Sequence, residues 1–296
     1  MSSPSWADAA LQQFDAIVQA TAGFRPRPGQ QQMATLVAQT FERAQLGKVA
    51  EGEGAPQRAL AVIQAGTGVG KSLAYCVPAI HVALARGTRV LISTATVALQ
   101  EQLVHKDLPT LAAQMPQPFA FALAKGRGRY VCKLKLERLL SGVGEDDDVV
   151  PDDLLAAEAA EQRLVRRSVA AQGERAQFYA SLAQSLASSQ WDGDRDQLPT
   201  PPEPELWASV AADAHTCTNK HCPLFAQCSY FERRKELVAA QVIVANHDLL
   251  LSSLGARLLP ELDNCLLILD EAHHLPSTAL AQFGCEMDIT RLAWID

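Results

Sequence analysis

Short apolar runs alternate with helical patterns along most of the chain, which predicts an α/β fold built on a parallel sheet. Five runs have the length and composition of buried strands; they span residues 59–64, 88–93, 119–124, 241–245 and 265–269. Helical patterns follow several of these runs, notably at residues 72–86 and 97–106, and residues 1–20 form an amphipathic pattern. The order of elements indicates one α/β domain.

This alternation stops between residues 125 and 235. Residues 152–190 are rich in Ala, Glu and Gln and predict a long helix, which a group of prolines at residues 199–204 ends. Strand signals resume only at residue 241. We therefore interpret residues 125–235 as an insertion into a domain formed by residues 1–124 and 236–296.

Charge is segregated along the chain. The net charge of −7 argues against a nucleic-acid partner, since phosphate binding depends on Lys and Arg. Residues 125–138 nevertheless hold six basic side chains and one acidic one, whereas residues 145–153 are strongly acidic. No run approaches the roughly 20 apolar residues of a membrane helix, and residues 1–20 lack Lys and Arg, so we expect a cytoplasmic protein without a membrane partner.

A glycine-rich loop follows the first apolar run and precedes a helical pattern, which is the setting of a Walker A phosphate loop. The loop comprises Ala65, Gly66, Thr67, Gly68, Val69, Gly70, Lys71 and Ser72. Its glycines let backbone N–H groups close around phosphate oxygens, and the helix N-terminus adds a favourable dipole. We expect Lys71 to contact the β and γ phosphates of ATP and Ser72 to bind Mg²⁺. Ala65 stands where the strict pattern has Gly.

The run at residues 265–269 ends in an acidic pair, Asp270 and Glu271. Alone, such a pair is weak evidence, because carboxylates often cap a following helix. Together with a phosphate loop it predicts that Asp270 holds Mg²⁺ and that Glu271 activates the attacking water. His273 is then placed to link the nucleotide site to the rest of the motor.

Seven cysteines in a chain without a secretory signal argue for metal binding rather than disulfides. Three of them lie among apolar neighbours and are expected in the core: Cys76, Cys265 and Cys285. The other four form a ligand group with spacings of 84, 4 and 5 residues: Cys132, Cys217, Cys222 and Cys228. Four thiolates bind either Zn²⁺ or an iron-sulfur cluster, and spacing alone does not choose between them.

At these motifs the chain resembles the DinG-type branch of superfamily 2 helicases, relatives of the XPD-type iron-sulfur helicases. Q-A-G-T-G-V-G-K-S at residues 64–72 is similar to motif I, S-T-A-T at 93–96 to motif Ia, and D-E-A-H at 270–273 to motif II. R-P-G-Q at residues 27–30 is similar to the Q-motif region, and V-A-N-H at 244–247 resembles another family segment.

The resemblance implies a RecA-like motor domain that couples ATP hydrolysis with Mg²⁺ to 5′ to 3′ movement on single-stranded DNA in repair or replication. It implies that Gln30 senses the adenine and that Thr94 and Thr96 line the path of the strand. A polar turn that caps a helix is the alternative reading of the two threonines. Iron-sulfur helicases place one cysteine early and three late between motifs Ia and II, which implies a [4Fe-4S] cluster on the four-cysteine group.

The basic segment enters the inserted domain as the family's does, so Lys125, Arg127 and Arg129 are expected to contact single-stranded DNA, with Tyr130 as a stacking surface. A solvated basic helix face is the alternative. The expected partners are single-stranded and forked DNA and a single-strand binding protein, and the expected state is a monomer.

The family's second motor domain, with motifs III to VI, is absent from these 296 residues. We therefore expect the chain alone to hydrolyse ATP slowly and not to unwind DNA, because an arginine finger contributes about 10³ to 10⁵ in turnover. Two other readings remain open: a P-loop remodelling ATPase with a structural zinc module and no DNA, and a module that binds nucleotide and DNA without turnover. Stimulation of ATP hydrolysis by single-stranded DNA separates them.

Overall fold

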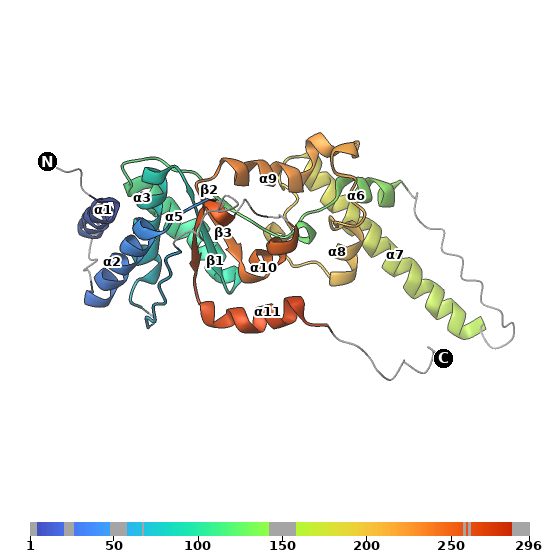
Figure 1. Cartoon of the computed structure of the whole chain (residues 1–296). Helices are drawn as coiled ribbons and strands as arrows, with labels where there is room; N and C mark the ends of the chain where they lie inside the picture. Colours follow the sequence, from blue (N-terminus) through green and yellow to red (C-terminus); the bar gives the residue numbers. More distant parts are fainter. Residues whose placement is uncertain are drawn as a thin grey trace, which may run out of the picture. The chain divides into compact units, whose positions relative to one another are not determined.

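The computed structural model describes residues 5–20, 27–47, 58–66, 68–141, 158–256, 259 and 262–285, with the backbone alone for residues 158–172. The chain divides into two compact units (Figure 1). The first unit combines residues 1–125 and 236–296, and the second is residues 126–235.

A parallel sheet forms the centre of the first unit, as the alternating pattern predicted. Its strands are β1 (Arg89–Thr94), β2 (Phe121–Leu123), β3 (Val242–Asn246) and β4 (Cys265–Leu269), in the spatial order β2-β3-β1-β4. Because β3 and β4 flank β1 in parallel, the carboxyl ends of all three strands meet at one edge of the sheet.

The strand predicted at residues 59–64 is wrong in this structure. These residues lie in no ladder of the described part of the chain, and Leu60 and Val62 are 87% and 91% exposed. Ile63 and Ala65 still pack against the core, so the segment buries one side of its alternating pattern. A strand also needs a neighbour for its backbone hydrogen bonds, and an apolar run alone does not supply one.

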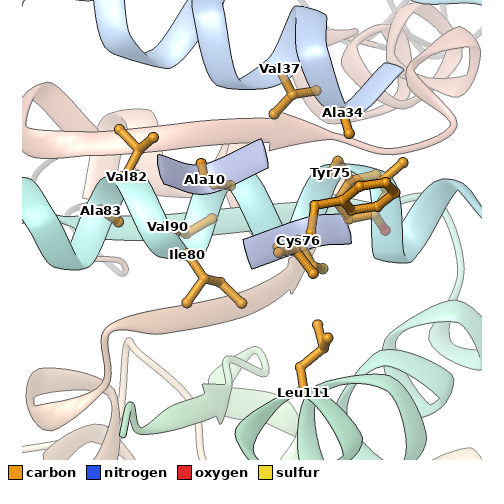
Figure 2. Packing of buried hydrophobic residues seen from close by; sticks show 14 of the residues in the cluster. Ala10, Ala34, Val37, Tyr75, Cys76, Ile80, Val82, Ala83, Val90 and Leu111 are labelled. Carbon is orange, nitrogen blue, oxygen red and sulfur yellow. The ribbon is translucent and has the colours of Figure 1, made fainter. Parts of the chain in front are cut away.

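One face of the sheet is covered by α1 (Trp6–Ala20), α2 (Pro28–Arg43) and α3 (Lys71–Arg86). The three helices pack against one another and enclose a continuous apolar cluster with the sheet. Figure 2 shows that cluster, in which α1 and α2 contribute small side chains such as Ala10 and Ala34 beside Tyr75 and Cys76 of α3. α4 (Val97–Gln102) leads into the π-turn Leu103–Asp107 and α5 (Leu108–Gln114), and these last two add side chains to the same cluster.

The other face of the sheet packs against α10 (His247–Ala256), which begins directly after β3. Leu249 and Leu250 of this helix join a second apolar cluster with Ile243 and Leu91 of the strands. A short helical turn, Ala272–His274, follows β4 and leads into α11 (Leu275–Phe283), which packs on α10. In the described residues the helices therefore lie on both faces of the sheet.

The second unit is helical. Its helices are α6 (Lys133–Leu140), α7 (Glu158–Ala187), α8 (Pro204–Val210) and the first part of α9 (Ser229–Ala239), with short turns at Arg127–Arg129, Arg195–Gln197, Asn219–His221 and Phe225–Gln227. Trp191 and Trp207 anchor its core, with ring centroids 6.4 Å apart. Each indole N–H donates to a backbone carbonyl at 2.7 Å, Trp191 to Asp194 and Trp207 to Gly128, so the buried rings keep their polar groups paired.

Two of the three cysteines expected in the core are buried, Cys76 fully and Cys265 nearly so. Cys285 is exposed, which corrects the third expectation. It follows the end of α11, where Leu280 and Phe283 are themselves exposed, so apolar neighbours in sequence do not imply a core position here. No helix in the described part of the chain is long and apolar enough to cross a membrane.

Candidate nucleotide site and cysteine group

The phosphate loop enters α3 through backbone conformations that favour glycine. Gly68 and Gly70 have φ values of 76° and 86°, in the left-handed region that side chains disfavour. Gly70 is the N-cap of α3, so Lys71 and Ser72 stand in the first turn, where backbone N–H groups have no helical partner. Ala65, Gly66 and Val69 are described and Thr67 lies outside the described residues. The loop has the geometry that binds phosphate.

Two side chains from the start of α2 hold this loop by its carbonyl groups. The Gln30 Nε2 donates to the Gly70 carbonyl at 3.0 Å, and the Arg27 guanidinium donates to the Gly68 carbonyl. Gln30 is fully buried, and its Oε1 has no hydrogen-bond partner among the described residues. The role of Gln30 as an adenine sensor stays a prediction, whereas its contact with the loop is a role that the sequence did not reveal.

The acidic pair lies beside the phosphate loop, although 200 residues separate Lys71 from Glu271. The Lys71 Nζ and Glu271 Oε1 atoms form an ion pair at 2.5 Å, with both side chains about one quarter exposed (25% and 29%). Asp270 is fixed through its backbone, because its N–H donates to the Ser93 carbonyl at 2.8 Å. The structure therefore brings together Lys71, Asp270 and Glu271, whose side chains were predicted to handle phosphate, metal and water.

The two carboxyl groups have opposite pKa shifts. Burial raises the pKa of Asp270, the Lys71 ammonium opposes that rise, and the Glu271 carboxylate adds to it. The hydrogen bond from Lys71 lowers the pKa of Glu271, which stays ionised as a result. His273 lies on the other side of Glu271, with its Nδ1 3.4 Å from Oε2, and its side chain is 67% exposed. Glu271 is thus held between two cationic or polar partners.

Tyr75, which the sequence did not single out, lies beneath the acidic pair. Its hydroxyl donates to Asp270 Oδ2 at 3.3 Å and also contacts the side chain of Ser72. Burial raises the pKa of Tyr75 well above its usual range, so the phenol stays neutral and acts as a donor. Tyr75 stands four residues after Lys71 on α3, a spacing that puts both on one helix face and was the available signal.

A second missed contact joins Ser93, the first residue of S-T-A-T, to His247, the last residue of V-A-N-H. The Ser93 Oγ and His247 Nδ1 atoms lie 2.7 Å apart in a hydrogen bond, and both residues are fully buried or nearly so. Next to them, Thr94 is buried and Thr96 is exposed. The Thr96 side chain caps α4 by accepting a hydrogen bond from the Leu99 N–H. A helix-capping turn was the alternative to a DNA contact for this segment.

The four-cysteine group belongs entirely to the second unit, and all four thiols are half-buried. Burial raises the pKa of Cys228, the backbone N–H groups of Phe231 and Tyr230 oppose that rise, and the thiols of Cys132 and Cys217 add to it. The thiols of Cys132 and Cys217 therefore both lie within electrostatic reach of Cys228. Among the described residues no three His, Cys, Asp or Glu side chains gather closely enough to hold a single metal ion.

The residues predicted to contact DNA have structural roles in this structure. Lys125 is nearly buried and forms an ion pair with Glu101 at 3.7 Å, and Arg129 pairs with Asp196 at 3.1 Å. Arg127 lies over the Tyr230 ring at 4.6 Å, and its Nε and Nη1 have no hydrogen-bond partner among the described residues.

Tyr130 is 3% exposed and packs against Tyr230, with ring centroids 5.8 Å apart. Stacking of the Tyr130 ring on DNA stays a prediction, and it requires the ring, which is buried in this structure, to become exposed. The DNA contacts of the three basic residues stay predictions.

Comparison with known proteins finds helicase families and helicase relatives. Residues 39–117 match the DEAD/DEAH box helicase family, and residues 209–292 match the DEAD_2 family. The chain is 38% identical over 245 residues to the ATP-dependent DNA helicase DinG of Photobacterium profundum, which covers 82% of this chain and 33% of the relative. It is 35% identical over 281 residues to the DinG helicase of Escherichia coli strain K12, covering 94% and 36%. The chain spans about a third of the length of these curated relatives.

Proposed function

We propose that this chain is part of a DinG-type ATP-dependent DNA helicase. In this proposal it supplies the unit that binds and hydrolyses ATP to drive movement along DNA. The observation that carries this proposal is the convergence of Lys71 and Glu271 at 2.5 Å next to a glycine loop at a helix N-terminus. Since the chain spans about a third of its relatives' length, the activity of the whole helicase is part of the proposal.

The chain's own residues divide the work of hydrolysis. Lys71 exchanges its Glu271 partner for the phosphates of ATP, because the same ammonium group cannot serve both at full strength. Glu271, once released, accepts the proton of the attacking water, and its ionised state is what a general base needs. The exposed His273 follows the position of Glu271 through their contact.

Magnesium fits the oxygen atoms next to this pair. Ser72 and Asp270 both reach the Tyr75 hydroxyl, so a hydroxyl and a carboxylate, which are hard oxygen ligands, converge on one point. When bound, Mg²⁺ neutralises charge on the phosphates of ATP. Tyr75 then orients Asp270 from below, as outer-shell hydrogen bonds orient metal ligands.

The four-cysteine group suits an iron-sulfur cluster. A single Zn²⁺ ion requires its four ligands around one atom, with each sulfur about 2.3 Å from the metal. In a [4Fe-4S] cluster each thiolate binds a different iron, so the sulfurs stand farther apart. Two thiols, those of Cys132 and Cys217, lie close enough to Cys228 to act on it, which supports a shared cluster on this group. The N–H groups of Tyr230 and Phe231 that face Cys228 are the kind of donors that tune a cluster.

We extend the proposal to single-stranded and forked DNA as substrates, 5′ to 3′ movement, action as a monomer alongside a single-strand binding protein, and a place in the cytoplasm. These follow from the family resemblance. Arg127 is the basic residue with hydrogen-bonding capacity left over, since two buried nitrogen atoms of its guanidinium have no protein partner among the described residues.

The test is ATP hydrolysis by the intact protein with and without single-stranded DNA. We expect DNA to raise the turnover number, and we expect Lys71→Ala to abolish turnover while leaving the melting temperature nearly unchanged, because the partly exposed ion pair contributes little to stability. Turnover that ignores DNA would instead favour a remodelling ATPase. Normal turnover in the Lys71→Ala variant would refute the nucleotide site.

A further inference from the structure

His247 is a buried polar residue without a role in the site described so far. It is the first residue of α10, one position beyond β3, and it is 1% exposed. A polar side chain at that depth costs free energy unless its hydrogen bonds are made. The contacts of its ring therefore indicate what the residue does.

One ring nitrogen of His247 is tied to the middle strand of the sheet. Its Nδ1 lies 2.7 Å from the hydroxyl of Ser93, which is fully buried in β1. The backbone of the same serine accepts from the Asp270 N–H at 2.8 Å. Ser93 thus touches both the residue that follows β3 and the residue that follows β4.

The other ring nitrogen, Nε2, is buried and has no hydrogen-bond partner within the described part of the chain. The backbone of Asp270 and Glu271 lies close enough to act on the ring, and it opposes the larger effect of burial, which lowers the pKa of His247. The ring therefore lies beside the turn that carries the acidic pair, with one nitrogen left without a partner.

The turn itself is strained. Glu271 has φ 54° and ψ 42°, in the left-handed region that a residue with a long side chain rarely adopts. A strained conformation persists only where its surroundings hold it, and such positions gather at catalytic sites. The buried ring of His247 lies beside this turn.

We propose that His247 is a positioning residue that holds the Asp270–Glu271 turn in the geometry needed for hydrolysis, with its ring fixed by Ser93. Ser93 begins the segment that continues into Thr94 and Thr96, so the same contact links the turn to the loop predicted to line the DNA path. The inference rests on the proposed ATPase function and adds to it the connection between β1, β3 and the acidic pair.

Two substitutions test the two ring nitrogens of His247 separately. In His247→Asn the amide replaces Nδ1 and keeps the bond to Ser93 but does not reach the turn. In His247→Gln the longer side chain places its amide near the position of Nε2. Ile243→Val, a buried apolar change on β3, the strand that precedes His247, controls for loss of packing.

The measurement is steady-state ATP hydrolysis by the intact protein, together with ATP affinity. We expect His247→Asn to lower kcat about tenfold, the size of one lost hydrogen bond, with little change in KM because the phosphate loop is untouched. His247→Gln should recover most of kcat, and Ile243→Val should keep it.

The inference is overturned if His247→Asn hydrolyses ATP normally, if Gln restores nothing, or if Ile243→Val loses as much activity. A wild-type protein without ATP turnover would overturn the proposed function, and the inference with it. The two failures can be distinguished. A failure of the proposed function appears in the unsubstituted protein, whereas a failure of the inference appears only in the variants.

Discussion

Replacing Tyr75 by Phe removes one hydroxyl from beneath the acidic pair and leaves the ring in place. That hydroxyl lies 3.3 Å from Asp270 Oδ2 and contacts Ser72, so both proposed magnesium ligands lose a neighbour. Because Tyr75 is 2% exposed and Phe has nearly the same shape, packing within the apolar cluster should survive.

The magnitude follows from the type of bond that is lost. A hydrogen bond to a charged group contributes about 1.5–3 kcal/mol, and a donor at 3.3 Å belongs at the lower end of that range. About 1.4 kcal/mol corresponds to a tenfold change in an equilibrium constant. The bond also lowers the pKa of Asp270, which burial already raises, so the variant protonates this ligand at a higher pH. Metal affinity should fall, since a bound carboxylate must be ionised.

The assay is ATP hydrolysis by the intact protein as a function of Mg²⁺ concentration. We expect Tyr75→Phe to raise the half-saturating Mg²⁺ concentration by up to about tenfold, the equivalent of about 1.4 kcal/mol. The matched control is Tyr179→Phe, which removes another buried hydroxyl, one that donates to the Leu206 carbonyl at 3.4 Å in the second unit. An unchanged Mg²⁺ dependence in Tyr75→Phe, or an equal shift in the control, would refute the reasoning.

Two further predictions concern the loop and the cysteines. Gln30→Ala removes the donor to the Gly70 carbonyl, so we expect a free energy of unfolding lower by about 1–3 kcal/mol and a higher KM for ATP, whereas exposed Gln32→Ala should change neither. Serine in place of any one of the four clustered cysteines should lower the iron and sulfide content of anaerobically purified protein, and serine at exposed Cys285 should not. Stoichiometric zinc without iron would contradict the cluster.

The sheet was readable from the sequence where a strand is buried on both faces. The runs that became β1 and β3 have apolar, buried centres, which are typical of parallel strands between two helical layers. β4 is apolar as well but is only partly buried. Residues 59–64 have the same composition and form no strand in the structure. The apolar composition of a segment shows that it is suited to burial. Whether the segment becomes a strand also depends on a neighbouring strand to which its backbone can bond.

The nucleotide site likewise contains some residues that the sequence revealed and others that it did not. Gly68, Gly70 and Lys71 were found because the loop's chemistry is written in consecutive residues, and their conformation follows from local backbone preference. Tyr75 and His247 were not found, since their partners lie 195 and 154 residues away in the chain. The position of Tyr75 four residues after Lys71, and of His247 in V-A-N-H, marks both residues without showing which partner each one contacts.

In the basic segment a local pattern suggests a DNA contact, and the structure shows that the same side chains also have partners within the protein. Six positive charges near residue 130 suggested a surface for DNA, yet the Lys125 ammonium pairs with Glu101 and the Arg129 guanidinium pairs with Asp196. Tyr130 was expected to offer its ring and instead lies in a buried aromatic cluster. Charge along a chain predicts a surface only after the partners that fold against it are known.

Strand register explains why the missed contacts occur where they do. Ser93 is aligned with Ala245 of β3 on one side and with Leu269 of β4 on the other. The residues just beyond these strands, His247 and Asp270, are therefore brought to the same level as Ser93, which bonds to both. A shift of one strand by one residue would turn its side chains to the opposite face and separate these groups. The carboxyl edge of β3, β1 and β4 thus places the V-A-N-H segment beside the acidic pair, whatever role the sequence suggested for each alone.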